Sequence, residues 1–247
     1  MMRSKLRLRE TLGLICLFLT IVALSITITI NFRPLYLFDI QHLNILKDVE
    51  VDRVTLIKNY DHLMMYLNNP FEKTLVFPDF PMSDSAAFHF YEVKKLFLLC
   101  YGVLLVTLMP SVLYLKYLVK NQRLWTLIRP FQWGMFLPVL FGFFMLIGFD
   151  QFFIAFHGLF FNNDAWLFNP LTDPIINALP EAYFMHCFIL FFVLLEGLFL
   201  IGVLIGKRSL KNKERKVNNS KIARFSFLFN LVLKTRLNNC QKYDILF

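Results

Sequence analysis

Two histidines lie beside apolar segments of the chain, and their imidazole side chains are suited to proton transfer. His157 lies within FDQFFIAFHGLFFNNDAW, residues 149–166, and His89 lies within AFHFYEVKKLF, residues 87–97. An imidazole has an ordinary pKa of about 6.5, so it can take or give a proton at neutral pH. Two such groups at a similar depth would supply a general base and a general acid.

Carboxylates accompany both histidines at helical spacing. Asp150 precedes His157 by seven residues and Asp164 follows it by seven, which is about two helical turns in each direction. Glu92 lies three residues after His89 and therefore on the same helical face. If each segment continues as a helix, each histidine shares a face with at least one carboxylate.

Aromatic residues crowd the stretch around His157. A belt at the membrane–water interface would explain them without any chemistry, but such belts favour Trp and Tyr and do not require histidine. Ionisable residues at membrane depth are functional candidates by default, and His89 at a similar level strengthens the case for a site. The aromatic residues in question are Phe152, Phe153, Phe156, Phe160, Phe161 and Trp166.

The composition predicts an all-α membrane protein. The 247 residues are 57% hydrophobic, above the roughly 45–50% of soluble domains, and the mean hydropathy is +0.55. Because a spanning helix needs about 20 apolar residues, we expect four transmembrane helices with a small extracytoplasmic cap. A third span that begins near residue 132 reaches Asp150 after roughly 27 Å, at the outer hydrocarbon boundary.

Basic residues set the orientation of these spans. The segments 32–95 and 150–182 hold seven basic residues against thirteen acidic ones, whereas eleven basic residues follow the fourth span. By the positive-inside rule both termini are cytoplasmic, so the net charge of +9 reflects topology and no nucleic-acid partner is expected. The expected parts are a cytoplasmic N-terminus with the first transmembrane helix (1–31), an extracytoplasmic cap (32–95), the second helix (96–118), a cytoplasmic loop (119–131), the third helix (132–149), an outer interfacial loop with a short helix (150–182), the fourth helix (183–206) and a basic cytoplasmic tail (207–247).

The first outer segment carries clear helix signals. Asp52 is placed to cap a helix that stops at Pro70, and Ser83 or Asp84 is placed to cap a helix that runs into the second span. Between these helices, residues 71–83 alternate in polarity and contain two prolines. That pattern predicts an edge strand or an extended segment.

The second outer segment is short and rich in prolines. Asp173 stands before Pro174, and Pro180 stands before Glu181. Proline is favoured at the first position of a helix, so each pair predicts a helix start. We therefore expect a short interfacial helix followed by the beginning of the fourth span.

The other ionisable residues favour structural roles. His42 and His62 lie in the cap, where a surface position without chemistry is the simpler interpretation, and His186 lies one turn into the fourth span, where packing is. Glu196 in the middle of that span needs a polar partner or water. The sequence has no H-E-x-x-H motif, no cysteine pair and no phosphate-binding loop, so neither a metal nor a cofactor is expected.

Three stretches together resemble the lipoprotein intramolecular transacylase family, Lit: AFHFYEVKKLF, FDQFFIAFHGLFFNNDAWLFNP and TDPIINALPEAYF. The resemblance covers roughly residues 1–206 and departs from the family at Glu92, where aspartate is more usual. It implies a bacterial cell-membrane enzyme with a site where the cap meets the membrane. The implied reaction moves the sn-2 acyl chain of a lipoprotein's diacylglyceryl group to the α-amino group of its N-terminal cysteine, which gives a lyso-form lipoprotein.

The resemblance also implies which residues act. Two histidines carry the chemistry in the family, and the matching positions are His89 and His157. We assign His157 as the base toward the amine and His89 as the donor to the oxyanion or leaving oxygen, while the residues alone also allow the reverse. We expect Glu92 to orient His89, and Asp150 or Asp164 to orient His157. The expected pocket for the substrate, a diacylglyceryl lipoprotein in membrane lipid, is lined by Phe153, Phe156, Phe160, Phe161, Asn163 and Trp166.

Two other classes of function remain open from the sequence. A non-enzymatic four-helix membrane protein whose cap binds a partner protein would tolerate replacement of both His89 and His157. A small transporter would place polar groups deep within several spans and would show an inverted repeat. Here the polar groups collect at one boundary, which favours the enzyme.

Overall fold

The computed structural model describes the backbone of residues 2–243 and the side chains of residues 8–227. In this part of the chain every regular element is a helix, so the all-α prediction is confirmed. The elements are α1 (Met2–Ile30), α2 (Arg33–His42), the 3₁₀-helix η1 (Ile45–Lys47), α3 (Arg53–Asn68), α4 (Asp84–Lys120), the 3₁₀-helix η2 (Leu124–Leu127), α5 (Ile128–Ile147), α6 (Phe149–Phe160), α7 (Ile175–Ala178) and α8 (Glu181–Tyr243).

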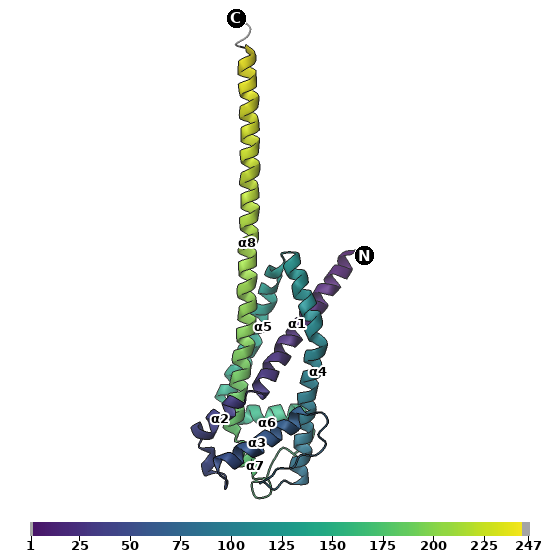
Figure 1. Ribbon diagram of the computed structural model, residues 1–247, viewed down its shortest axis with the longest axis vertical. Coiled ribbons are helices and arrows are strands. Elements are labelled where there is room, and N and C mark those ends of the chain that lie inside the picture. The colour runs from purple at the N-terminus through teal and green to yellow at the C-terminus, as the bar shows by residue number, and fades with distance from the viewer. Residues whose placement is uncertain (1, 244–247) are drawn as a thin grey trace.

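Four helical segments are long and apolar enough to cross a membrane, as predicted, and they form the bundle in Figure 1. Large apolar side chains point outward from them: Leu105 is 75% exposed and Val193 is 63% exposed. Such a continuous apolar exterior is compatible with lipid as the solvent and with few other surroundings. The four segments are Leu8–Ile30, Asp84–Lys120, Leu124–Ile147 and Glu181–Phe227.

The bundle is held by helix pairs that approach closely. The two most extensive helix–helix interfaces join α1 to α4 and α5 to α8. Between α5 and α8 the rings of Phe131 and Phe199 meet edge to face with centroids 5.4 Å apart. Gly202 permits this approach, because a Cβ atom there would lie 2.0 Å from the Phe131 ring.

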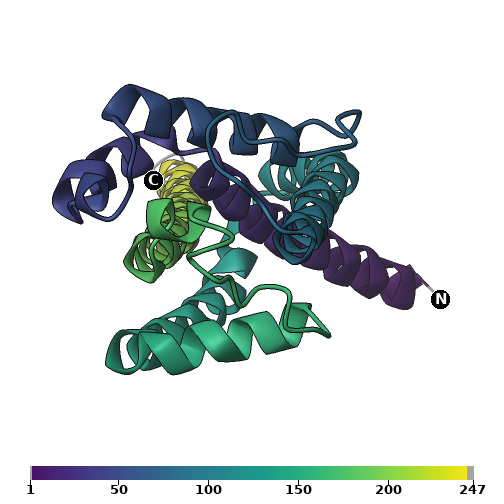
Figure 2. The same ribbon diagram turned by 90° about the horizontal axis from the view of Figure 1, so that it is seen from below.

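The cap is a small helical layer across one end of the bundle, seen end-on in Figure 2. Its core is aromatic: Tyr36 of α2 stacks on Tyr60 of α3 with ring centroids 3.8 Å apart, and Tyr183 of α8 meets Tyr36 edge-on at 5.3 Å. The Tyr36 hydroxyl donates a hydrogen bond to the Ala178 carbonyl of α7 (3.1 Å). These contacts attach the cap directly to the start of the fourth span.

The segment between α3 and α4 is extended but forms no strand, so the edge-strand alternative was wrong. The alternation seen in the sequence is real: Leu75 and Phe77 are buried in the cap core, while Val76 is 70% exposed. The described part of the chain offers this segment no neighbouring strand. It is held instead by its alternate apolar side chains and by hydrogen bonds to α3, where the Asp79 N–H donates to Asn59 Oδ1 (3.2 Å) and the Asn59 amide donates to Asp79 Oδ2 (2.9 Å).

The helix caps predicted for α3 and α4 are present. The Thr55 N–H donates to Asp52 Oδ1 (2.7 Å), and the Ala86 N–H donates to Ser83 Oγ (3.1 Å). Each bond satisfies a backbone donor that the helix itself leaves without a partner. The α4 cap also fixes the residue from which the helix carrying His89 begins.

Asp173 clamps the loop before α7 to the start of α4, a contact that the sequence did not reveal. Its Oδ1 accepts the Ser83 N–H at 2.6 Å, and its Oδ2 accepts the hydroxyls of Ser83 at 3.0 Å and of Thr172 at 2.7 Å. Burial alone would raise the pKa of Asp173, but the hydrogen bonds from Ser83 and Thr172 outweigh burial and lower the pKa from its ordinary value of 3.8.

The third span does not continue into the His157 segment as one helix, which corrects the expectation that it runs past residue 149. α5 ends at Ile147, Gly148 leaves the helical region with φ −151° and ψ 77°, and α6 begins at Phe149. Figure 1 shows α6 lying across the end of the bundle between the spans and the cap. His157 is therefore carried by a crossing helix.

We expect the Asp173→Asn variant to weaken the attachment of the cap. The substitution removes the charge that accepts three hydrogen bonds, and bonds to a buried charged group contribute about 1–3 kcal/mol to stability. Because the pKa of Asp173 is lowered by folding, its contribution is present above the ordinary pKa and disappears as the pH falls through the folded value. Thermal unfolding of purified protein at pH 7 and at pH 3 measures both effects.

A matched control for this prediction is Asp48→Asn, which removes an exposed cap carboxylate that has no hydrogen-bonded partner in the described structure. Its unfolding temperature should equal that of the original chain. Equal unfolding temperatures at pH 7 for Asp173→Asn and Asp48→Asn would contradict the clamp.

Candidate active site

The structure brings the two predicted histidines together. His89 of α4 and His157 of α6 lie 68 residues apart in the sequence, yet their ring centroids are 5.8 Å apart. His89 is 7% exposed and His157 is 8% exposed. One small group, such as an ester carbonyl, can reach both rings at once. This pair is the centre of the candidate active site.

Two contacts hold the His157 ring. Its Nδ1 lies 2.8 Å from the Phe153 carbonyl oxygen, and its face stacks on Trp166 at a centroid distance of 4.5 Å and an angle of 28°. A carbonyl oxygen can only accept, so Nδ1 carries the hydrogen and Nε2 keeps its lone pair. This tautomer presents Nε2 as a proton acceptor.

The surroundings of His157 favour the neutral imidazole. Burial among aromatic rings lowers the pKa of His157 from its ordinary value of 6.5, and the hydrogen bond to Phe153 opposes this only in part. At neutral pH the ring is therefore in the form that takes up a proton. A base must be in this form before it can act.

His89 lies in an apolar setting of its own. Phe161 and Phe168 approach its ring edge-on, with centroids 4.8 Å and 5.6 Å away. Its Nδ1 is buried without a hydrogen-bond partner in the described part of the chain. A buried polar atom without a partner is uncommon and destabilising, and such atoms concentrate where a ligand supplies the missing bond. His89 is thus free to bond a substrate atom.

Glu92, which we expected to orient His89, makes a different contact. Both oxygens of Glu92 accept the side-chain amide of Asn163, at 3.2 Å and 3.1 Å, and no hydrogen bond joins Glu92 to His89 in the structure described. Glu92 therefore ties α4 to the loop after α6. The orientation of the two rings comes from aromatic packing and a backbone carbonyl.

The two aspartates near His157 also lie away from its ring. Asp150 lies beside Glu181, close enough for their carboxyl groups to share a hydrogen bond. Asp164 is exposed, and its described hydrogen bond is the one that its carbonyl accepts from the Leu167 N–H (3.0 Å). The chain leaves α6 at Phe160, so Asp164 does not share the helical face of His157. Asp150 does lie on α6, but two turns, or about 10 Å, separate it from His157 along the helix.

Most of the expected pocket residues do surround the histidines. Three of them pack against the His157 ring, with distances between ring centroids of 4.2 Å for Phe153, 5.8 Å for Phe156 and 5.7 Å for Phe161. Phe160 is 48% exposed and packs on Phe156 instead. Phe168 was not predicted as a pocket residue. Its position two residues after Trp166, in the same aromatic stretch, was the signal in the sequence that could have revealed it.

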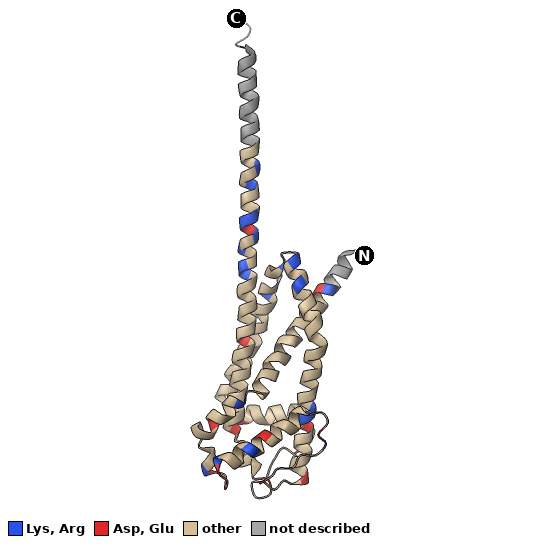
Figure 3. Cartoon of the chain, in the orientation of Figure 1, with Lys and Arg blue, Asp and Glu red and all other residues tan. Residues whose placement is uncertain are grey.

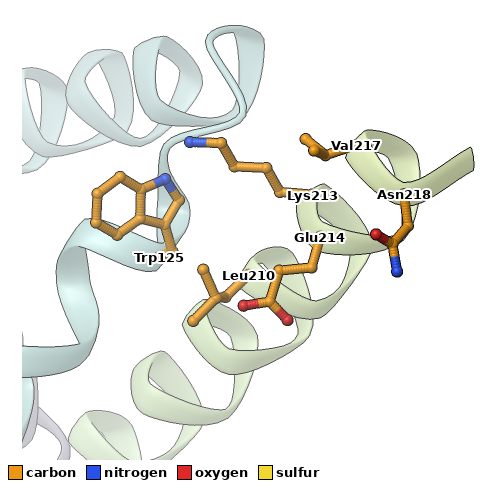
Figure 4. A pocket seen from close by; sticks show the side chains of 6 residues that line it. All are labelled: Trp125, Leu210, Lys213, Glu214, Val217 and Asn218. Atoms are coloured by element: carbon orange, nitrogen blue, oxygen red, sulfur yellow. The ribbon is translucent and has the colours of Figure 1, made fainter. Parts of the chain in front are cut away.

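The remaining candidates lie elsewhere. His62 bonds the Lys58 carbonyl of its own helix (3.1 Å), and Oε1 of Glu196 is buried with no partner in the described part. A hollow at the far end of the bundle, between η2 and α8, is lined by Trp125 and by α8 residues including Lys213 and Glu214 (Figure 4). It contains no histidine or cysteine. No cluster of three metal-binding side chains occurs among the residues that the structure describes.

The arrangement can support acyl transfer. Nε2 of His157 is a proton acceptor, and His89 offers an unbonded ring nitrogen 5.8 Å away, measured between ring centroids. An ester held between them would meet a base on one side and a donor on the other. The aromatic cage around both rings excludes water, which would otherwise compete as the acyl acceptor.

Comparison with known proteins agrees with this reading. The family model for Lipoprotein intramolecular transacylase Lit matches residues 11–184. The chain is similar to the in meso structure of the membrane-integral Lit from Bacillus cereus, with 29% identity, a TM-score of 0.81 and coverage of 85% of this chain and 97% of that one. None of the curated proteins compared with the chain matches it.

Two further structures of the Bacillus cereus protein are also similar. One carries a histidine-to-arginine mutation and matches with 27% identity and a TM-score of 0.74, covering 87% of this chain and 100% of that one. The other carries a histidine-to-alanine mutation and matches with 28% identity and a TM-score of 0.74, covering 85% and 95%.

The Glu92–Asn163 contact yields a test by exchange of the bonding groups. Asn163→Asp places two carboxylates against each other, so we expect the protein to lose about 1–3 kcal/mol of stability. Adding Glu92→Gln restores a donor opposite an acceptor with the bond reversed. Thermal unfolding should show a lowered midpoint for the single variant and recovery in the double variant. A double variant no more stable than Asn163→Asp alone would refute the contact.

Proposed function

Since the chain belongs to the lipoprotein intramolecular transacylase family, we propose that it moves the sn-2 acyl chain of a lipoprotein's diacylglyceryl group to the α-amino group of the N-terminal cysteine. The product is a lyso-form lipoprotein with one remaining glyceryl ester. Membership of the family makes the chain an enzyme that acts on lipoproteins and a multi-pass bacterial membrane protein.

One observation carries the proposal: two imidazole rings from different helices meet inside an aromatic cage where the spans join the cap. His157 presents a lone pair and His89 an unbonded nitrogen. Acyl chains lie in lipid, while the cysteine amine of a lipoprotein lies just outside it. The ester and the amine would therefore meet at this depth.

The proposed steps conserve atoms and protons. The α-amine attacks the ester carbonyl carbon while Nε2 of His157 takes a proton from the nitrogen. His89 donates a hydrogen bond to the oxyanion that forms. The C–O bond to the glyceryl oxygen then breaks, that oxygen receives the proton that His157 had taken from the amine, and an amide and a free hydroxyl result. No protein nucleophile is needed, because the substrate supplies the amine.

Proximity supplies much of the remaining rate. The amine and the ester belong to one molecule, and well-oriented intramolecular reactions reach effective molarities of about 10⁵–10⁸ M. The cage formed by Phe153, Phe161 and Trp166 would hold the two reacting groups in contact. The enzyme then needs only to position the groups and move protons.

The distribution of charge supports an orientation. Figure 3 shows basic residues concentrated at the end of the bundle where α1 begins and α4 meets α5, and along α8 beyond it, while acidic residues collect in the cap. By the positive-inside rule we propose that both termini are cytoplasmic. The cap and the histidine pair would then face outward, where mature lipoproteins are anchored.

The proposal predicts the kinetics of histidine variants. With a synthetic diacylglyceryl lipopeptide and purified enzyme, we expect His157→Ala and His89→Ala to lower kcat/KM by about 10²–10⁴-fold each, the usual effect of losing an acid–base group. His62→Ala is the matched control, since that ring bonds only its own helix, and its kcat/KM should be unchanged. Full activity in either of the first two variants, with unaltered thermal unfolding, would refute the two-histidine mechanism.

The direction of the His157 pKa predicts the pH profile. An α-amino group has a pKa of about 7.7–8.0, whereas the pKa of His157 is lowered below 6.5. Between pH 6.5 and 8 only the amine should titrate, so log kcat/KM should rise with a slope of one near pH 6.5 and level off as the pH passes the pKa of the amine. A slope of two below about pH 7.5 would mean that His157 also loses a proton in that range, which would contradict its lowered pKa.

A further inference from the structure

A second histidine cluster lies between α2 and α8. Nδ1 of His186 lies 2.8 Å from Oδ1 of Asp39, whose side chain is 0% exposed. The His42 ring is 5.8 Å from the His186 ring and stacks on Phe38 at 5.0 Å. A buried carboxylate paired with an imidazole is a polar arrangement that the packing of two helices does not require.

This cluster is separate from the candidate active site. Phe184 and Phe188 of α8 face α6, where they contact Phe153 at 5.6 Å and Phe152 at 4.9 Å. His186 lies two residues from each, about 200° around the helix, and therefore points to the opposite side. The α8 helix stands between the two sites.

An apolar groove leads away from the cluster along α8. Its α8 side repeats at helical spacing with His186, Ile189, Leu190 and Val193, which extends about 10 Å into the span. Leu35, Phe38 and His42 form the α2 side. Phe38 is 59% exposed and Val193 is 63% exposed. In a membrane-integral protein the groove opens to lipid, so an acyl chain is the occupant that fits its walls.

The polar end of the groove selects the headgroup. Asp39 occupies Nδ1 of His186, so Nε2 is the ring nitrogen left for a ligand. A hydroxyl group suits this nitrogen in either protonation state, because it donates to a neutral ring and accepts from a charged one. A phosphate beside the buried Asp39 would meet a like charge. The chemistry therefore favours a neutral, hydroxyl-bearing headgroup.

We propose that the groove between α2 and α8 is a second lipid site, which binds a glycerolipid of the bilayer through a free glyceryl hydroxyl on Nε2 of His186. The acyl chain lies against Ile189, Leu190 and Val193, and His42 flanks the headgroup. The site does not depend on the proposed transacylation.

A photoreactive monoacylglycerol with a diazirine in its acyl chain tests the proposal. The full-length protein in phosphatidylcholine nanodiscs is irradiated with this probe, and labelled peptides are mapped by mass spectrometry. We expect labelling of α2 and of α8 around residues 189–193. Unlabelled monopalmitoylglycerol should displace the probe there, whereas methyl palmitate, which has the chain but no hydroxyl, should not.

Two variants make the assignment specific. His186→Ala should lower labelling of the groove by about fivefold, the effect of losing one hydrogen bond. Because that change leaves Asp39 without its partner, Val193→Phe provides a second variant that fills the groove from an exposed position without touching the pair. Ile201→Phe, also exposed on α8 but outside the groove, is its control and should label normally.

The outcomes separate the possible occupants. Equal displacement by methyl palmitate, or labelling unaffected by Val193→Phe, would overturn the proposal in favour of ordinary surrounding lipid. Stronger displacement by palmitoyl lysophosphatidic acid would overturn the hydroxyl assignment in favour of an anionic ligand. Groove labelling should persist in His157→Ala, so loss of transacylase activity and loss of this site are distinguishable.

Discussion

The turn of the chain at Gly148 is the constraint on which the candidate site depends. There α5 ends at the cap end of the bundle, and α6 starts in a new direction across it (Figure 1). His157 thereby approaches His89 from a crossing helix. Phe188 of α8 holds α6 in place through edge-to-face contacts with Phe152 and Phe156, at centroid distances of 4.9 Å and 5.1 Å. A continuous third span would have carried His157 away from the bundle.

The same geometry explains why the two rings are so well enclosed. The loop after α6 folds back and places Trp166 on His157 and Phe168 beside His89. Burial keeps His157 neutral, and the Phe153 carbonyl selects the tautomer with a free Nε2. An enclosure of this kind suits transfer to an amine, because water is the competing acceptor and is kept away. The Glu92–Asn163 contact anchors the loop that carries Trp166 and Phe168.

Hydropathy, charge and capping patterns were sufficient to predict the four spans and the cap, because each depends on local composition or spacing. The choice of His89 and His157 rested on their side-chain type, their similar depth and the family resemblance, and their roles remain a prediction. Asp52 and Ser83 cap their helices as their types indicate. What could not be read from spacing was the direction of the chain after Ile147, since one glycine does not reveal a turn. The pairing of Glu92 with Asn163, and of Asp173 with Ser83, likewise joins residues 71 and 90 positions apart. Such contacts exist only once the tertiary fold has formed.

The central claim is that one molecule supplies both the acyl chain and the amine. The most direct measurement is mass spectrometry of the lipopeptide product from an equal mixture of two substrates, one with deuterated acyl chains and one with a ¹⁵N-labelled peptide. The account predicts an N-acyl cysteine with one remaining glyceryl ester. Deuterated N-acyl chains should occur only on peptides without ¹⁵N, and undeuterated N-acyl chains only on ¹⁵N-labelled peptides. Unchanged diacylglyceryl peptide, or N-acyl chains exchanged between the two substrates, would contradict it.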